Sequence, residues 1–207
     1  MTDTTIPSSG TQNFFERSTS KVYDLYLNNY IESADNYKEW NQLFRAATPQ
    51  DVIYMHINSY GGDLNTAIQM IRAMRECQGT IITSIEGACM SAATVIFLQG
   101  DVCEVSDHSQ FMVHTYSGGS WGKGSEIVAQ VLHDNDWISN LFQDVYRGFL
   151  SEDEIDAVIA GTDMWMSPTD VFNRLKKRAA MLEKEAKAEE KSQKSAPRKR
   201  TSRKSTT

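Results

Sequence analysis

Short segments typical of buried strands alternate with helical segments through the middle of the chain, and this alternation limits the fold more than any other feature. Val52–Ile57 (VIYMHI) and Thr80–Ile85 are rich in apolar and β-branched residues. Leu64–Glu76, between them, carries apolar residues at helical spacing. Strands that alternate with helices favour a largely parallel sheet with right-handed crossovers. The chain is therefore expected to have an α/β fold.

Further strands and helices are expected on either side of this core, together with a flexible connection, Ser117–Gly124, that contains four glycines. Ser151 and Glu154 have the spacing of a capping box at the start of one helix. Ser167-Pro168 begins the last helix. The other expected elements are strands at Lys21–Tyr30, Val102–Val105 and Phe111–His114, and helices at Ser33–Ala47, Ser91–Gln99 and Ser125–Arg147.

Charge divides the chain into an acidic body and a basic end. Residues 1–173 contain 8 Lys and Arg against 23 Asp and Glu, whereas residues 174–207 contain 13 against 4. The net charge of −15 on the body argues against nucleic-acid binding by the fold itself, because phosphate contacts need clustered Lys and Arg. We expect a flexible segment at residues 1–20, a folded domain at residues 21–183 and a basic disordered tail at residues 184–207. The tail is either a solvated, solubilising segment or a contact for nucleic acid or an acidic protein.

The cysteines and the apolar segments favour a soluble protein of the cytoplasm. Cys77, Cys89 and Cys103 form an odd, sparse set without a CxxC pair, which fits a reducing compartment. The N-terminus lacks the basic and apolar regions of a signal peptide. The longest apolar run, Ala88–Leu98, is shorter than the ~20 residues of a membrane span. Because the sequence has no zinc-ligand spacing, Walker loop or GxGxxG motif, no metal or cofactor is expected.

Ser91 is the first candidate for catalysis. It follows an expected strand and a glycine-containing turn in GACMSAATVIFL, at the start of an expected helix. A helix N-terminus has unpaired N–H groups that favour a developing oxyanion, and the small neighbours Ala92 and Ala93 allow close approach. The alternative is an ordinary N-cap serine. The motif is not the G-x-S-x-G elbow, because Cys89 stands two positions before the serine.

A nucleophilic serine needs a base, and the sequence offers four histidines: His56, His108, His114 and His133. His114 is favoured because it ends an apolar strand (FMVH) and precedes the glycine-rich connection. Ends of strands beside loops are where α/β folds place functional groups. The alternative is a structural histidine held by hydrogen bonds.

An acid and a tight turn are weaker candidates. Asp163 lies in an expected loop beside the apolar Met164-Trp165-Met166 and could orient a histidine, although it could equally be a surface or capping residue. Gly61 and Gly62 follow an expected strand and allow a positive φ and a close backbone approach. The alternative for this pair is an ordinary turn between a strand and a helix.

Three segments, taken in order, resemble the ClpP family, the proteolytic subunit of the ATP-dependent Clp protease: HINSYGGDLNTAIQMIRAM, GACMSAATVIFLQG and FMVHTYSGGSWGKGSEI. The resemblance extends from Val52 to Leu175. The INSPGG, G-x-x-x-S, M-I-H and D-x-x-[ML]-S motifs of that family correspond to Ile57–Gly62, Gly87–Ser91, Met112–His114 and Asp163–Ser167.

The resemblance implies a serine endopeptidase that cleaves unfolded polypeptides through an acyl-enzyme. In it, Ser91 would be the nucleophile, His114 the general base and then acid, and Asp163 the orienting carboxylate. The backbone N–H groups of Gly62 and Ala92 would form the oxyanion hole.

The segments that contact substrate depart from the family pattern. Gly61, Thr115 and Tyr116 would contact a substrate strand, but Thr115-Tyr116 replaces the Gln-Pro of the family, which puts the pairing there in question. Tyr60 replaces the proline of the INSPGG turn.

The resemblance also implies a fold and an assembly. The fold would be a spiral of ββα units, as in crotonases, with a protruding handle formed by Gly118–Gly124 and the helix after it. The assembly would be a homo-oligomer of stacked rings, typically two heptamers, with the active sites inside. ATP would act only through an unfoldase partner. The N-terminal part lacks the usual axial-loop sequence of the family, which argues against docking to a Clp ATPase and fits a divergent, virus-encoded member.

Two other functions stay open at the level of sequence. A crotonase-like acyl-CoA enzyme would share the spiral fold and an oxyanion hole but would not need a Ser–His–Asp set. A catalytically inactive ring-forming scaffold would capture partners through the basic tail.

Overall fold

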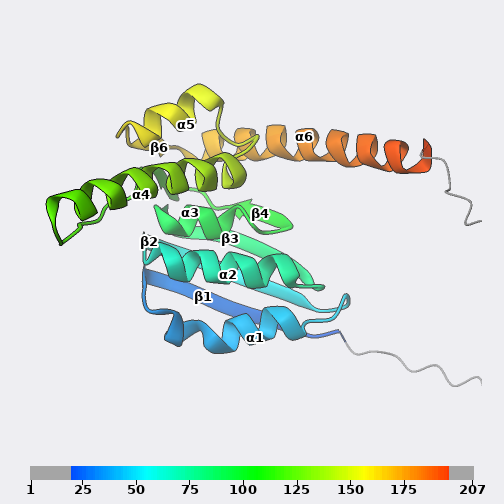
Figure 1. Ribbon diagram of the computed structural model, residues 1–207. Coiled ribbons are helices and arrows are strands. Elements are labelled where there is room, and N and C mark those ends of the chain that lie inside the picture. Colours follow the sequence, from blue (N-terminus) through cyan, green and yellow to red (C-terminus); the bar gives the residue numbers. More distant parts are fainter. Residues whose placement is uncertain (1–19, 196–207) are drawn as a thin grey trace, which may run out of the picture.

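The computed structural model describes the backbone of residues 20–195. The expected flexible segment at the N-terminus therefore falls almost entirely outside the described residues. One six-stranded sheet forms the centre of the molecule (Figure 1). Its strands are β1 (Val22–Ile31), β2 (Val52–Gly62), β3 (Thr80–Met90), β4 (Val102–Val105), β5 (Gln110–Val113) and β6 (Met164–Met166).

The sheet is mixed, and most of its strand pairs are parallel. Its order is β1-β2-β3-β5-β6, with β4 paired to β3. Every pair is parallel except β5–β6, which is antiparallel. The largely parallel α/β core expected from the sequence is confirmed. The short strand β6 was not predicted, because three residues give too little alternation to recognise.

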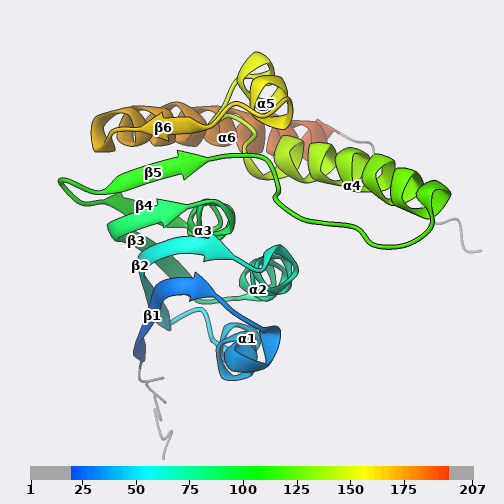
Figure 2. The same ribbon diagram turned by 90° about the vertical axis from the view of Figure 1, so that its left-hand side faces the viewer.

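Helices on one face of the sheet bury the core (Figure 2). Along β2 the side chains of Ile53, Met55 and Ile57 are fully buried, as alternation in a strand requires. Phe44 of α1 and Met70 of α2 are also fully buried. The helices are η1 (Ala34–Tyr37, a 3₁₀ helix), α1 (Lys38–Ala46), α2 (Leu64–Glu76), α3 (Ala92–Phe97), α4 (Gly124–Val145), α5 (Glu152–Ile159) and α6 (Pro168–Ser195).

Two strands run further than the sequence indicates. β2 continues through the predicted turn to Gly62, and β3 continues past Gly87 to Met90. The pairing of β2 with β1 and with β3 is irregular near these ends, with register shifts after Asn29 and Ile57. The extra residues carry the backbone directly to the starts of α2 and α3.

The long amphipathic helix α4 is confirmed, and it protrudes from the body (Figures 1 and 2). Its C-terminal half packs on the core, where Ile138, Phe142 and Val145 are at most 3% exposed. Its N-terminal half leaves apolar side chains in solvent, with Val128 and Leu132 59% and 61% exposed. We call these two parts the root and the tip of α4.

The last two helices are tied together by a strong ion pair. The predicted capping box of α5 is confirmed, since Ser151 and Glu154 exchange hydrogen bonds of 2.9 and 3.2 Å. Arg174 of α6 donates two hydrogen bonds to the Glu154 carboxylate, at 2.7 and 2.8 Å, and these lower the pKa of Glu154 to about 2. The prediction of disorder from Lys184 is wrong as far as Ser195, because α6 continues through these residues. The rest of the tail lies outside the described residues.

No helix in the described part of the chain is long and apolar enough to cross a membrane.

Candidate active site

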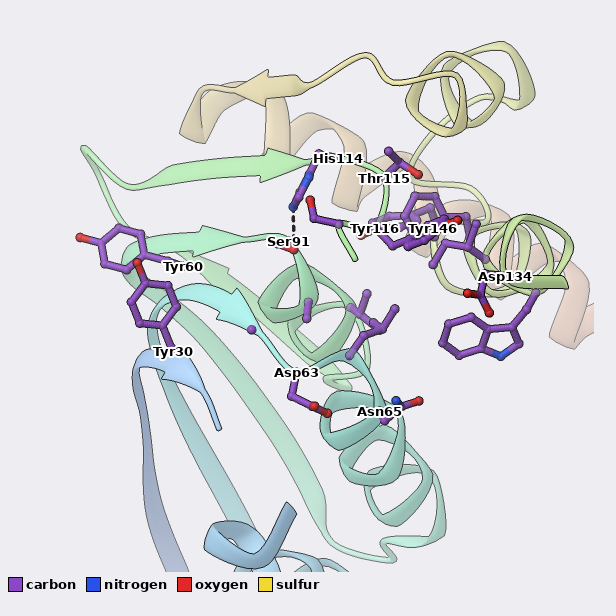
Figure 3. A pocket seen from close by; sticks show the side chains of 18 of the residues that line it. Tyr30, Tyr60, Asp63, Asn65, Ser91, His114, Thr115, Tyr116, Asp134 and Tyr146 are labelled. Atoms are coloured by element: carbon purple, nitrogen blue, oxygen red, sulfur yellow. Dashed lines mark hydrogen bonds between the residues drawn. The ribbon is translucent and has the colours of Figure 1, made fainter. Parts of the chain in front are cut away.

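Ser91 sits in a strained turn between β3 and α3. Its backbone has φ 54° and ψ −129°, a conformation that residues other than glycine rarely adopt and that is common at functional sites. Its side chain does not cap α3, so the structure contradicts the N-cap interpretation. Instead, the hydroxyl points toward the edge of β5 (Figure 3).

His114 follows the last residue of β5, and its ring meets the serine. The distance from His114 Nε2 to Ser91 Oγ is 2.8 Å (Figure 3). The backbone explains this approach: β3 and β5 are paired through Met90 and Met112, and the Ser91 N–H donates to the Met112 carbonyl at 2.9 Å. The structure therefore brings together the predicted nucleophile and the predicted base.

The other histidines lie elsewhere or on another wall. His56 contacts the carboxylates of Asp24 and Glu86 on the exposed face of the sheet. His108 occupies a turn with φ 65°. His133 belongs to α4 and lines the cavity described below, but no hydrogen bond joins it to Ser91 in the described structure.

Asp163 lies just beyond the end of the β5–β6 pairing and is not bonded to His114. The last antiparallel pair of these strands is Val113 with Met164, so His114 directly follows the paired segment of β5 and Asp163 directly precedes that of β6. Asp163 is exposed, and among residues 20–195 no hydrogen bond joins its carboxylate to the His114 ring. The predicted third residue is therefore near the end of the same strand pair as His114, without a bond to it.

A cavity of about 690 Å³ opens beside the Ser91–His114 pair (Figure 3). We call one side of it the body wall, which is formed by residues at the ends of β2, β3 and β5 and at the starts of α2 and α3: Gly62, Asp63, Ser91, Ala92, Val95 and His114. We call the opposite side the helix wall, which is formed by residues of α4: Gln130, His133, Asp134, Trp137, Ile138 and Phe142.

The two residues expected to form an oxyanion hole both line this cavity. Ala92 directly follows Ser91 and begins α3. Gly62 has φ 143°, and a Cβ added there would stand 2.3 Å from the carbonyl oxygen of Ile31, so only glycine fits.

The three expected substrate contacts also lie around the nucleophile. Gly61 lies directly against Ser91, because a Cβ on this glycine would be 2.6 Å from the serine Cβ. Thr115 and Tyr116 line the cavity just after His114. The Tyr116 hydroxyl donates to Asn135 of α4 at 3.2 Å, which links the segment after β5 to the helix wall.

Sequence reasoning missed a buried hydrogen-bond chain behind the nucleophile. The Thr94 hydroxyl donates to the Ser91 carbonyl at 2.6 Å and accepts from the Tyr146 hydroxyl at 2.6 Å. Burial raises the pKa of Tyr146, so this phenol stays protonated and able to donate. No local motif marks Tyr146, which is 55 positions after Ser91 and reaches it only through the fold.

Sequence reasoning also missed an aromatic pair at the mouth of the cavity. Tyr30 at the end of β1 and Tyr60 near the end of β2 lie with their ring centroids 5.7 Å apart. The only available signal was Tyr60 in place of the family's proline.

Within the described part of the chain, no three His, Cys, Asp or Glu side chains are grouped so as to hold a metal ion. Cys77, Cys89 and Cys103 are free.

Comparison with known proteins identifies a family that matches most of the chain. The family model of the Clp protease matches residues 19–174, which include Ser91, His114 and Asp163. The ATP-dependent Clp protease proteolytic subunit of Chlorella vulgaris is 34% identical over 80 residues, which are 38% of this chain and 40% of the relative. That of Pleurastrum terricola is 32% identical over 101 residues, 48% of this chain and 45% of the relative. Subunit 2 from Synechococcus sp. (strain CC9605) is 26% identical over 133 residues, 62% and 66% of the two chains. The alignments thus cover less than two thirds of each of these relatives.

Proposed function

The chain belongs to the Clp protease family, and we propose that it is a serine-type endopeptidase that hydrolyses unfolded polypeptides through Ser91, His114 and Asp163. The observation that carries this proposal is the 2.8 Å contact between Ser91 Oγ and His114 Nε2 at the edge of a large cavity. A base within hydrogen-bond reach of a serine hydroxyl is the first geometric requirement of such a mechanism.

The first half of the reaction forms an acyl-enzyme. His114 Nε2 takes the proton from Ser91 Oγ as the oxygen attacks the carbonyl carbon of the peptide bond. The carbonyl oxygen becomes an oxyanion, which the N–H groups of Gly62 and Ala92 would stabilise. When the tetrahedral intermediate collapses, the C–N bond breaks and the protonated His114 gives its proton to the leaving amine.

The second half releases the product. A water molecule gives one proton to His114 Nε2 while its oxygen attacks the acyl carbon. The C–O bond to Ser91 then breaks, and the serine oxygen regains the proton from His114. The peptide leaves with a free carboxyl group.

Asp163 has the role of orienting His114 and stabilising its protonated ring. The β5–β6 register supports this role, because its continuation by one position beyond Val113 and Met164 would set the two residues opposite one another. A contact between the exposed Asp163 carboxylate and Nδ1 would require the Asp163 side chain to move. The proposal therefore includes an ordering step at Asp163 when substrate or neighbouring subunits bind.

The assembly we propose is a homo-oligomer of stacked rings, with two heptamers as the expected form. The tip of α4 supports an interface there, since Val128, Val131 and Leu132 are 41–61% exposed on a helix that protrudes from the body. Solvent-exposed apolar groups of this kind mark association surfaces. ATP would be used only by a separate unfoldase, because the sequence contains no Walker loop.

The Ser91–His114 contact favours a peptidase over the two other functions considered from the sequence. A crotonase-like acyl-CoA enzyme needs an oxyanion hole but no serine–histidine pair. An inactive scaffold would have no reason to keep Ser91 in a strained backbone conformation against a histidine.

A serine-directed probe and one substitution test the proposed function. A fluorophosphonate should label the protein at Ser91, and Ser91→Ala should lower kcat for peptide cleavage on the order of 10³-fold or more. Ser139→Ala on α4 is the matched control, because the Ser139 hydroxyl bonds only to the Asn135 carbonyl. Peptide turnover that is unchanged in Ser91→Ala would refute the proposal.

A further inference from the structure

We infer that the cavity beside Ser91 selects polypeptides with a lysine or arginine at the residue whose carbonyl is attacked, and that Asp134 on the helix wall provides this selectivity. The inference rests on the proposed function, because it assumes that the substrate residue whose carbonyl is attacked places its side chain in the cavity. It adds the charge of the preferred substrate and the residue that determines it.

The interior of the cavity suits a long aliphatic stem. Val95 on the body wall and Ile138 and Phe142 on the helix wall are apolar and at most 3% exposed as residues. Lysine and arginine bury their methylene groups along such surfaces while the charged end stays in a polar setting. An apolar lining alone would accept a leucine or methionine side chain equally well, so a preference for lysine or arginine must come from a charged group in the cavity.

Asp134 provides an unused negative charge in the same cavity. It is half-buried and lines the cavity on the opposite side from Ser91 (Figure 3). No hydrogen bond or ion pair involves its carboxylate anywhere in the part of the chain that the structure describes. A partly desolvated carboxylate without a partner is unfavourable, and a cationic side chain would supply the missing charge-assisted bond.

The other charged groups around the cavity add to its negative charge. Asp63 also lines it, and although one carboxylate oxygen accepts from the Thr66 N–H at 2.6 Å, the negative charge remains at the opening. Among the described lining residues there is no Lys or Arg, and only His114 and His133 could become cationic. The net charge of −6 on the whole chain adds a weak long-range attraction for basic polypeptides.

The experiment compares two peptides that differ only in charge at the selected position. One fluorogenic peptide carries lysine immediately before the cleaved bond, and the other carries norleucine, which has the same stem length without the ammonium group. For the wild-type protein we expect kcat/KM to favour lysine by roughly tenfold to a hundredfold, as expected for one hydrogen-bonded charge pair. Asp134→Asn should reduce this ratio toward one by lowering only the value for lysine.

Asp136→Asn is the matched control, since it removes an equal charge from the same helix at a position that does not line the cavity. This variant should keep the lysine preference of the wild type. Equal or higher kcat/KM for norleucine in the wild type, or a lysine preference that survives Asp134→Asn, would overturn the inference.

Binding to the inert Ser91→Ala variant separates the inference from the proposed function. The lysine peptide should bind this variant more tightly than the norleucine peptide, and adding Asp134→Asn should abolish the difference. Equal binding of the two peptides overturns the inference, whether or not the wild type cleaves them. Lysine-selective binding without any cleavage by the wild type would support the inference and count against the peptidase.

Discussion

The two walls of the cavity are built in different ways. The body wall is formed at strand ends, where backbone pairing between β3 and β5 fixes Ser91 and His114 within 2.8 Å of each other. The helix wall belongs to α4, which packs on the core only through its root and otherwise protrudes into solvent. The proposed reacting groups on the body wall are thus held by backbone pairing between strands, whereas the positions of groups on the helix wall depend on how one helix packs against the body.

The same contrast separates the two sides of His114. Its Nε2 faces Ser91 across paired strands and makes the contact. Asp163 lies just before the three-residue strand β6, and it is exposed and unbonded to the ring within the described structure. Strand pairing therefore holds the site only as far as His114, and a substitution at Asp163 is the best test of the comparison.

The substitution Asp163→Asn should have the largest effect, and this effect should be a loss of catalytic rate. Asparagine keeps the size of the side chain but cannot stabilise a protonated His114, so kcat should fall on the order of 10³-fold or more. The measurement is steady-state cleavage of a fluorogenic peptide. Fluorophosphonate labelling of Ser91 should also become slower, because the histidine is no longer held in the correct tautomer.

Asp170→Asn provides the control for this change. Asp170 lies seven residues after Asp163, and its carboxylate caps α6 through Ser167. Its substitution should alter stability slightly and leave kcat within about twofold, as for a surface site away from the chemistry. If both substitutions have equally small effects on kcat, then Asp163 does not orient His114 and the acid side of the site lies elsewhere.

The body wall could be predicted from the sequence much better than the helix wall. Strand-like content and helical spacing located β2, α2, β3 and α3, and parallel pairing brings the ends of such strands to one edge. Ser91 and His114 were chosen because they stand at those ends, and the structure places them in contact. The pattern could not predict the strained backbone of Ser91. Its φ of 54° results from the extension of β3 to Met90 and not from any local motif.

The helix wall could not be predicted from the sequence, for a different physical reason. The apolar spacing of α4 predicted an amphipathic helix but did not predict which of its apolar residues are buried. Val131 and Ile138 are both β-branched apolar residues at helical spacing, so the sequence does not distinguish them. Which side chains enter the cavity depends on the angle at which α4 leaves the body. Asp134 and Tyr146 therefore carried no signal. The continuation of α6 to Ser195, into the first part of the expected disordered tail, shows the same limit, because a Lys/Glu/Ala stretch suits both states.

A second prediction tests whether α4 is held only at its root. Phe142→Ala removes a ring that is 3% exposed and packs edge-on against Tyr146 at 5.0 Å, so it should lower the free energy of unfolding by about 3–5 kcal/mol. Leu132→Ala at the tip removes a side chain that is 61% exposed and should change the free energy of unfolding of the subunit by less than about 0.5 kcal/mol.

Urea unfolding with an unchanged m-value measures both effects. Size-exclusion chromatography over a range of concentrations shows whether the Leu132→Ala variant loses association instead, as an interface at the tip requires. Equal losses of free energy of unfolding in the two variants would mean that the tip is packed as tightly as the root.

The smallest expected effect compares a glycine beside Ser91 with a glycine in the connection that leads to α4. Gly61 has φ 89°, and a Cβ there would lie 2.7 Å from the Met90 carbonyl oxygen and 2.6 Å from the Ser91 Cβ. Gly61→Ala should therefore cost about 1–3 kcal/mol of unfolding free energy, because the strained backbone and the close approach add together. It should also lower kcat, since the new methyl group pushes against the nucleophile.

Gly119, in the connection that leads to α4, is the matched control, because a Cβ there would have no atom within 4 Å. Gly119→Ala should leave stability and kcat close to those of the wild type, and thermal unfolding with peptide turnover measures both. The two substitutions add the same methyl group, so a difference between them reports the backbone conformation and the surroundings of each glycine. A cost at Gly119 as large as that at Gly61 would show that the connection to α4 is as constrained as the backbone beside Ser91, and the contrast between the two regions would fail.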